Sequence, residues 1–204
     1  SSTSSVVDPD AAAFAIMQSK HPVPPGDSAL AAHPTHRNFS FQPKDVKESL
    51  KSFPSGSGSG PDGLRPQHLK DAISFSAGDA APELLDNLTT LINRICTQGV
   101  HTSIRSSFYG ARLIALTKTN GDLRPIAVGC TIRRLVGKTL LQPNIPLARE
   151  LFNPHQVGVG TRLGCEAAVH AVREYIATNQ NTDKVILKLD LSNAFNSVRR
   201  DVML

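Results

Sequence analysis

The fold and function of this chain are best interpreted from one segment, Lys184-Val-Ile-Leu-Lys-Leu-Asp-Leu-Ser-Asn-Ala-Phe-Asn196. Within it, a run of β-branched and other apolar residues leads to a single carboxylate, Asp190, and a small polar turn follows. Residues of this kind favour a buried strand. A strand that ends in an acid and a turn can hold a metal ion at the edge of a sheet. We therefore expect a buried strand over residues 185–189 that presents Asp190 as a metal ligand.

The chain is basic, and its charge is unevenly distributed. Its 204 residues suffice for one domain or one and a half, and a net charge of +5 suits an anionic partner, although a modest basic surface often has no such partner. Between residues 101 and 138, seven cationic side chains accompany one acid, Asp122. These cations are Arg105, Arg112, Lys118, Arg124, Arg133, Arg134 and Lys138.

The three cysteines, Cys96, Cys130 and Cys165, are far apart and have no CxxC spacing. This pattern favours neither a disulfide framework nor a zinc site, and it indicates a reducing compartment. The sequence also contains no apolar run of membrane-spanning length and no signal segment. We expect an intracellular protein without membrane association, and the residues do not distinguish nucleus from cytoplasm. The first residue, Ser1, and the end soon after residue 196 suggest a piece of a longer chain.

The periodicity of apolar residues predicts a mixed, α+β architecture. Residues 1–42 are expected to form an extended, poorly ordered arm, interrupted by a short helix that Asp10 caps. The segments 111–117 and 124–128 read as a β-hairpin whose turn contains Asn120-Gly121. Pro125 in the return strand indicates an edge strand. Helices are predicted over residues 43–50, 79–99, 132–141 and 164–178, and a further helix is predicted to start at Pro66.

The segment Ser55-Gly-Ser-Gly-Ser-Gly-Pro-Asp-Gly63 allows two interpretations. Its composition favours a flexible linker. Alternatively, it is a glycine turn that opens the helix starting at Pro66 and brings Arg65 and Lys70 near a phosphate, since helix N-termini favour anions. It is not a Walker loop, because the Gly-Lys-Ser/Thr ending is missing.

Five segments, taken in their order along the chain, resemble the reverse transcriptases of non-LTR, LINE-type retrotransposons. They are Gly60-Pro-Asp-Gly-Leu64, Leu113-Ile-Ala-Leu-Thr-Lys118 with Gly121-Asp-Leu-Arg-Pro-Ile126, Arg133-Arg-Leu with Lys138, His155-Gln-Val-Gly158, and Leu189-Asp-Leu-Ser-Asn-Ala-Phe195. The resemblance implies a partial right-hand polymerase fold. Residues 43–180 would form the helix-rich fingers with a β-hairpin, and residues 181–204 the start of the palm with its first catalytic motif.

The resemblance implies a role for each residue around Asp190. Asp190 would bind both catalytic Mg²⁺ ions with the help of the Leu191 carbonyl, because two-metal chemistry needs a hard anionic oxygen that bridges the ions. Phe195 would lie under the sugar of the incoming nucleotide and exclude a 2′-hydroxyl, which selects deoxynucleotides. The backbone N–H groups that would contact the triphosphate belong to Ser192, Asn193 and Ala194.

The resemblance also implies cationic contacts elsewhere. Lys118 and Arg124 would close the hairpin over the triphosphate, the first as a point charge and the second as a bidentate fork. RNA template, DNA primer and deoxynucleotide triphosphate would be the partners of the complete enzyme, and its oligomeric state is left open. The residues expected near template or nucleotide, or as general nucleic-acid contacts, are Arg65, Arg133, Arg134, Lys138, Gln156 and Gly158.

Simpler interpretations stand beside these roles. Taken alone, Asp190 reads as a turn or cap residue and Phe195 as a core residue. Lys118 reads as a solvated hairpin residue and Arg124 as a surface ion-pair partner. The pair Arg133-Arg134 is typical of a solvated helix face. The sequence also contains no Asp-Asp pair, which the second palm motif of the family requires. One carboxylate cannot hold two Mg²⁺ ions with useful affinity, so we expect this polypeptide to be inactive alone as a polymerase.

Two other functions remain open. The chain could be a non-catalytic nucleic-acid-binding remnant of a retroelement that uses the basic residues 101–138. It could also be an unrelated α/β phosphotransferase, in which Asp190 would lie at the carboxyl end of a strand in a parallel sheet.

Overall fold

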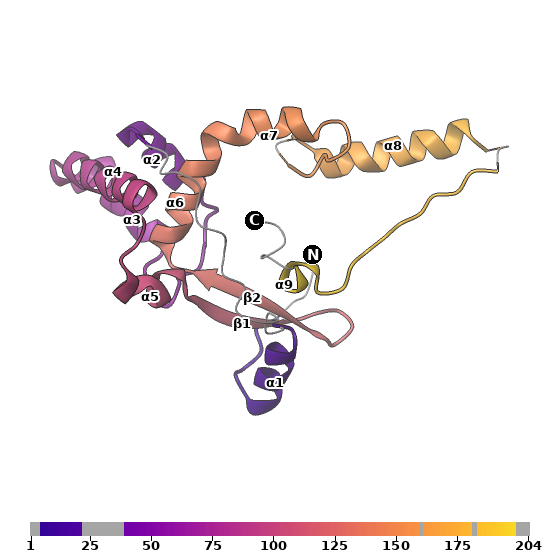
Figure 1. Ribbon diagram of the computed structural model, residues 1–204, viewed down its shortest axis with the longest axis horizontal. Helices are drawn as coiled ribbons and strands as arrows, with labels where there is room; N and C mark the ends of the chain where they lie inside the picture. The colour runs from indigo at the N-terminus through magenta and orange to yellow at the C-terminus, as the bar shows by residue number, and fades with distance from the viewer. Residues whose placement is uncertain (1–4, 22–38, 160, 181–182, 199–204) are drawn as a thin grey trace. The chain divides into compact units, whose positions relative to one another are not determined.

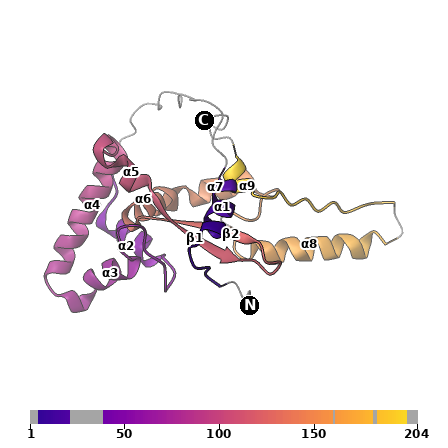
Figure 2. The same cartoon turned by 90° about the horizontal axis from the view of Figure 1, so that it is seen from below.

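The computed structural model describes residues 5–21, 39–159, 161–180 and 183–198. These residues form helices and one two-stranded antiparallel sheet, an α+β content that confirms the predicted class in its coarse form (Figures 1 and 2). The chain divides into two compact units, residues 1–136 with 191–204, and residues 137–190. No parallel sheet occurs in the described part, so the parallel-sheet phosphotransferase finds no support.

The first unit combines a hairpin with a set of short helices. Its strands are β1 (Ala111–Thr117) and β2 (Leu123–Gly129). Its helices are α1 (Ala11–Ser19), α2 (Pro43–Lys51), α3 (Pro66–Ala72), α4 (Ala80–Gln98), α5 (Arg105–Tyr109), the start of α6 (Thr131–Leu141) and α9 (Ala194–Ser197), with 3₁₀ turns η1 (Phe75–Ala77) and η2 (Thr102–Ile104). These bounds confirm the helices predicted in this part of the chain.

Helix boundaries follow the local capping chemistry that the sequence predicts. The Asp10 carboxylate accepts a hydrogen bond from the Ala13 N–H at 2.6 Å and so caps α1. At the start of α2, the Gln42 N–H donates to Asp45 Oδ2 at 2.8 Å. The helix α4 ends at Gly99, whose φ of 73° is readily adopted by glycine.

The hydrophobic core of the first unit lies between α2, α4 and α6. Val46, Leu50, Ile92 and Leu135 are completely buried there. Each comes from a helix whose apolar residues recur every three or four positions, so the apolar helix face that the sequence predicts is the face buried in the core.

The hairpin has the predicted strands and a three-residue turn. Ala111 pairs with Gly129 and Thr117 with Leu123 across the ladder. The turn closes when the Gly121 N–H donates to the Lys118 carbonyl at 3.0 Å, and Gly121 takes a φ of 82°. Positive φ at this position is characteristic of three-residue hairpin turns, so the Asn-Gly signal is confirmed through its glycine.

Part of the N-terminal arm is ordered against the hairpin. Val6 forms a β-bridge with Leu116, and the Val7 N–H donates to the Ala115 carbonyl at 3.0 Å. Together with α1, this short pairing corrects the expectation of a poorly ordered arm for residues 5–21. Residues 22–38 of the predicted arm lie outside the described residues.

The glycine-rich segment 55–63 packs against the protein body, so its interpretation as a linker is wrong. The Leu64 carbonyl accepts a hydrogen bond from Thr131 Oγ1 at 2.5 Å, and the Gly58 carbonyl accepts one from Arg134 Nη2 at 2.6 Å. A Cβ at Gly60 would lie 2.6 Å from the Cys130 backbone. Glycine is needed here for close approach of two backbones, which composition alone does not reveal.

The second unit contains the end of α6, the 3₁₀ turn η3 (Gln142–Asn144), α7 (Ile145–Phe152), α8 (Gly164–Thr178) and an extended segment that ends at Asp190. The helix α8 matches its predicted bounds. None of the helices in the described residues combines the length and the apolar character that crossing a membrane requires.

The buried strand predicted over residues 185–189 is not formed. Val185 is 88% exposed, Leu187 and Leu189 are also exposed, and the segment pairs with no described strand. The apolar run does favour an extended backbone, but a strand is buried only when neighbouring strands and a covering layer are present. The described residues supply neither for this segment.

Candidate functional site

Two lysines converge on one carboxylate at the tip of the hairpin. Lys118 Nζ lies 2.7 Å from Asp122 Oδ2, across the turn. Lys20, the residue that follows α1, places its Nζ 2.7 Å from the same oxygen and 2.8 Å from Asp122 Oδ1. The tip therefore carries two ammonium groups, and within the described part of the chain one acid, Asp122, pairs with both.

The sequence indicated one of these lysines and not the other. Lys118 and Asp122 flank a predicted turn, so their pairing could have been anticipated. Lys20 is 102 residues from Asp122, and nothing in its neighbourhood signals the contact. The contact arises because the N-terminal segment pairs with β1 and carries α1 to the tip.

The two lysines hold the pKa of the Asp122 carboxyl well below its usual range, Lys118 contributing most, then Lys20, then the Leu123 N–H. Since the folded-state pKa is depressed, the ion pairs stabilise the fold above about pH 4, and this contribution is lost as the pH falls through the depressed pKa. We expect an NMR titration of the Asp122 carboxyl to show a low midpoint. Lys118→Gln should raise it more than Lys20→Gln. An ordinary midpoint in the unmodified chain would contradict the geometry.

Arg124 is the exposed cation beside the tip. Arg124 pairs with Leu116 across the hairpin, next to the Thr117–Leu123 pair that adjoins the turn. Among the described residues it forms no ion pair, which sets it apart from Lys118. Its alternative interpretation as a surface ion-pair partner is therefore not supported, and the ion pair of Lys118 with Asp122 corrects the alternative that Lys118 is only a solvated hairpin residue.

The segment predicted to contact the triphosphate meets the same lysine. Asn193 Nδ2 donates a hydrogen bond to the Lys20 carbonyl at 2.8 Å. Asn193 has a φ of 52° and is followed directly by α9, which begins at Ala194. Lys20 thus contacts two predicted site segments: its side chain binds Asp122 and its backbone carbonyl binds Asn193. Ser192, the residue before Asn193, is exposed.

Phe195 is exposed, with 92% of its surface accessible, so it is not a core residue of the described chain. An aromatic ring presented to solvent suits stacking or a steric check on a ligand more than packing. Its proposed role beneath a nucleotide sugar stays a prediction.

The donor set around Asp190 does not amount to a two-metal site. Asp190 is exposed at the end of the extended segment of the second unit, and Leu191 opens the final part of the first unit. The described residues contain no group of three or more His, Cys, Asp or Glu side chains that could hold a metal ion. Paired Mg²⁺ ions need several carboxylate oxygens, so these residues do not fit them.

The cationic residues of α6 do not form a solvated face. Arg133 Nη1 donates to the Tyr109 carbonyl at 2.6 Å, and its guanidinium fills the space where Gly129 has no side chain. Arg134 binds the Gly58 carbonyl and lies 5.5 Å from the Phe53 ring centroid. Both side chains are half-buried because they tie neighbouring loops to the helix, and this corrects the helix-face interpretation.

The remaining predicted contacts belong to both units. Arg65 is exposed immediately before α3, and Lys138 is half-buried in the second unit. Gln156 Oε1 accepts a hydrogen bond from the Gly158 N–H at 2.7 Å and so closes its own turn. Among the predicted site residues, the structure therefore brings Lys118 and Asn193 into contact with one network through Lys20 and Asp122.

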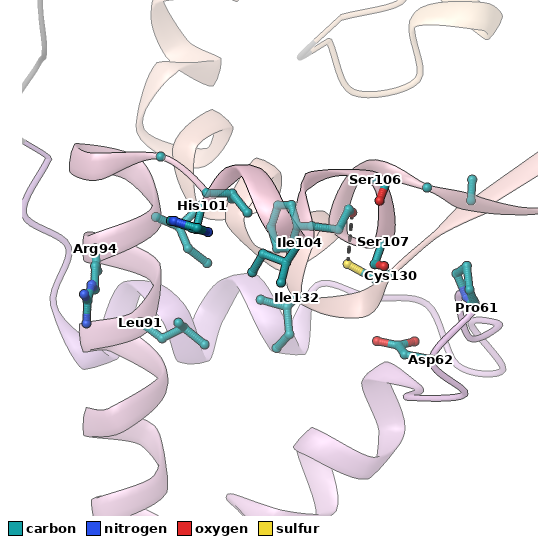
Figure 3. A pocket seen from close by; sticks show the side chains of 16 residues that line it. Pro61, Asp62, Leu91, Arg94, His101, Ile104, Ser106, Ser107, Cys130 and Ile132 are labelled. Atoms are coloured by element: carbon teal, nitrogen blue, oxygen red, sulfur yellow. Dashed lines mark hydrogen bonds between the residues drawn. The ribbon is translucent and has the colours of Figure 1, made fainter.

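A large, mostly apolar cavity of about 1020 Å³ lies between α4, α5 and the start of α6. Figure 3 shows Ile104 and Ile132 facing each other across it, with Arg94 toward one end and Asp62 toward the other. No candidate residue predicted from the sequence lines this cavity. The sequence did not indicate it, because its lining comes from separate segments between Pro61 and Ile132.

No protein-family model, curated protein or solved structure matches this chain.

Proposed function

We propose that this chain is the fingers region and first palm segment of an RNA-directed DNA polymerase of the LINE type, and that nucleotide phosphates bind at the β1–β2 tip. The observation that carries the proposal is the position of Lys20. Its side chain shares Asp122 with Lys118, and its carbonyl binds Asn193. Two segments that are distant in sequence, both expected at the nucleotide, thus contact one residue.

The packing of the other resembling segments supports the proposal. Gly60 lies against Cys130 at the end of β2, and Leu64 is bonded to Thr131 at the start of α6. The Gly60–Leu64 segment, the hairpin and the start of α6 therefore pack together within the first unit. Sequence segments that act on one substrate are expected to be held together in this way.

The chemistry of the tip suits a triphosphate. Phosphate oxygens would take the place of the Asp122 carboxylate between Lys118 and Lys20, and Arg124 would add a bidentate contact. Phe195 would meet the deoxyribose. Because the donor set around Asp190 is incomplete, the polypeptide is expected to bind nucleotide, template and primer without adding nucleotides to the primer.

Charge substitutions at the tip test the phosphate site. We expect Lys118→Gln to weaken binding of deoxythymidine triphosphate by about threefold to tenfold, because one charge-assisted contact is lost at a partly exposed site. Asp122→Asn should strengthen binding, since it removes the competing carboxylate and keeps an oxygen for the Leu123 N–H. Competition against a fluorescent nucleotide, followed by anisotropy, measures both changes.

The matched control is Arg149→Gln, which removes one positive charge from α7 in the second unit. Equal loss of affinity in Arg149→Gln and Lys118→Gln would mean that the weaker binding reflects only the lower net charge, and it would contradict a phosphate site at the tip. Tighter binding of deoxythymidine triphosphate than of its ribonucleotide counterpart, lost in Phe195→Ala, would support the polymerase.

The second candidate is a non-catalytic nucleic-acid-binding remnant. The incomplete donor set around Asp190 in the described residues favours it. This candidate predicts salt-dependent RNA binding that Asp190→Asn leaves unchanged, with no preference between the two sugars.

A further inference from the structure

A second basic surface surrounds an exposed aromatic residue at the junction of α2, α3 and η1. Within the first unit, α3 contacts both α2 and η1. A hollow of about 340 Å³ lies there, and it is separate from the hairpin tip. It is lined by Lys47, Lys51, Lys70, Ile73, Ser74 and Phe75.

Phe75 is fully exposed because its neighbours fix the turn that carries it. Ile73 before it is buried, and Ser74 Oγ donates to the Asp71 carbonyl at 2.6 Å. Ser74 also shares a hydrogen bond with Ser76 at 2.7 Å, so the backbone of η1 is held with the ring outward. A single exposed apolar side chain is ordinary on a protein surface, and the charges around this one decide its interpretation.

The lysines around Phe75 differ in how they are bound. Lys70 Nζ donates hydrogen bonds to the Phe53 carbonyl at 2.7 Å and to the Lys51 carbonyl at 3.3 Å. These bonds fix the Lys70 side chain at the end of α2. Lys47 and Lys51 are one helical turn apart on α2 and are exposed. Neither forms an ion pair with any residue that the structure describes.

The acids near this surface only partly balance it. Asp71 accepts a hydrogen bond from Gln67 Nε2 at 2.7 Å, and Asp45 caps the start of α2. Glu48 is exposed beside Lys47. The lining itself contains three lysines and no carboxylate.

We propose that this surface binds single-stranded nucleic acid, with one base stacked on Phe75 and the flanking phosphates on Lys47 and Lys51. An exposed aromatic ring beside cations is the arrangement that binds single strands with little sequence preference. The inference rests on the proposed function in taking nucleic acid as the partner, but it shares no residue with the hairpin tip. A membrane surface fits less well, because the apolar face of α2, with Val46 and Leu50, is buried in the core.

A tryptophan reporter tests the stacking directly, because the chain contains no tryptophan. In Phe75→Trp, we expect short oligothymidylate and oligouridylate each to quench the fluorescence, since every base has a face that stacks. Phe14→Trp is the control, because Phe14 is an exposed aromatic residue of α1, away from this surface. Phe75→Ala should weaken oligonucleotide binding about fivefold or more.

The lysines are tested by the salt dependence of binding. Replacing Lys47 and Lys51 together by glutamine should lower the slope of log affinity against log salt by about 1.4, since each phosphate contact contributes about 0.7 on a single strand. Replacing Arg149 and Lys188 of the second unit together by glutamine is the control for the loss of two charges. Triphosphate binding at the hairpin tip should remain unchanged in all these variants, so failure here and failure of the tip site are distinguishable.

Three results would overturn the proposal. They are no quenching in Phe75→Trp, equal quenching in Phe14→Trp, and quenching by phosphatidylserine vesicles but by neither oligonucleotide. If Phe75→Trp is quenched and the double lysine variant keeps the full salt slope, the phosphate contacts assigned to Lys47 and Lys51 are wrong.

Discussion

Replacing Gly60 by alanine is expected to destabilise the first unit by about 3 kcal/mol, the upper part of the range for overpacked sites. The added Cβ would lie 2.6 Å from both the Cys130 Cα and N atoms and 2.8 Å from the Gly129 carbonyl carbon. All three are backbone atoms, so no side chain can rotate away to relieve the clash. Urea unfolding followed by far-UV circular dichroism would measure the loss as a lower midpoint.

The neighbouring glycine provides the matched control for this substitution. A Cβ at Gly58 would meet nothing within 4 Å. We expect Gly58→Ala to change the free energy of unfolding by about 0.5 kcal/mol or less, or to stabilise slightly through the unfolded state. Similar unfolding midpoints for the two variants would show that the segment 55–63 is loosely attached, as its composition suggests.

The second large effect is expected at Ile92. This residue is completely buried in the core formed by α2, α4 and α6. We expect Ile92→Ala to lower the free energy of unfolding by about 2–5 kcal/mol, because apolar contacts are lost and a cavity remains. The same urea titration measures it, and a loss below about 1 kcal/mol would mean that this core is not closely packed.

Leu91, the preceding residue on α4, is the control for Ile92. It is 42% exposed and lines the apolar cavity of the first unit. Leu91→Ala removes a similar volume from a site that solvent already reaches, and alanine favours the helix. Its expected effect is about 1 kcal/mol or less, so the difference between adjacent positions isolates the contribution of burial.

The elements of this protein were largely predictable because their signals are local. Asp10 caps α1, Gly99 ends α4 and Gly121 closes the hairpin, and each acts within one turn of backbone. The candidate site was predictable only in part. The pairing of Lys118 with Asp122 follows from the turn, whereas the contribution of Lys20 requires α1 to be carried to the hairpin tip.

Burial separates the predictions that were confirmed from those that were wrong. The apolar run 185–189 indicates an extended backbone, yet it stays exposed because no described strand pairs with it. The glycine-rich segment 55–63 reads as a linker, yet it packs because Gly60 lets two backbones meet. In both cases the outcome depends on whether a partner from elsewhere in the chain packs against the segment, and composition carries no information about that.

The sequence by itself determined the helices, the hairpin and the cationic residues at its tip, because these depend on side-chain period, caps and turn geometry. Only the tertiary structure decided which cations remain available. Arg133 and Arg134 are used to hold neighbouring loops, Lys70 holds the end of α2, and Lys47 and Lys51 stay exposed beside Phe75. The physical reason is that a charged side chain binds whichever carbonyl or carboxylate the packing brings within hydrogen-bond distance. Which acceptor lies within that distance depends on contacts between segments far apart in the chain.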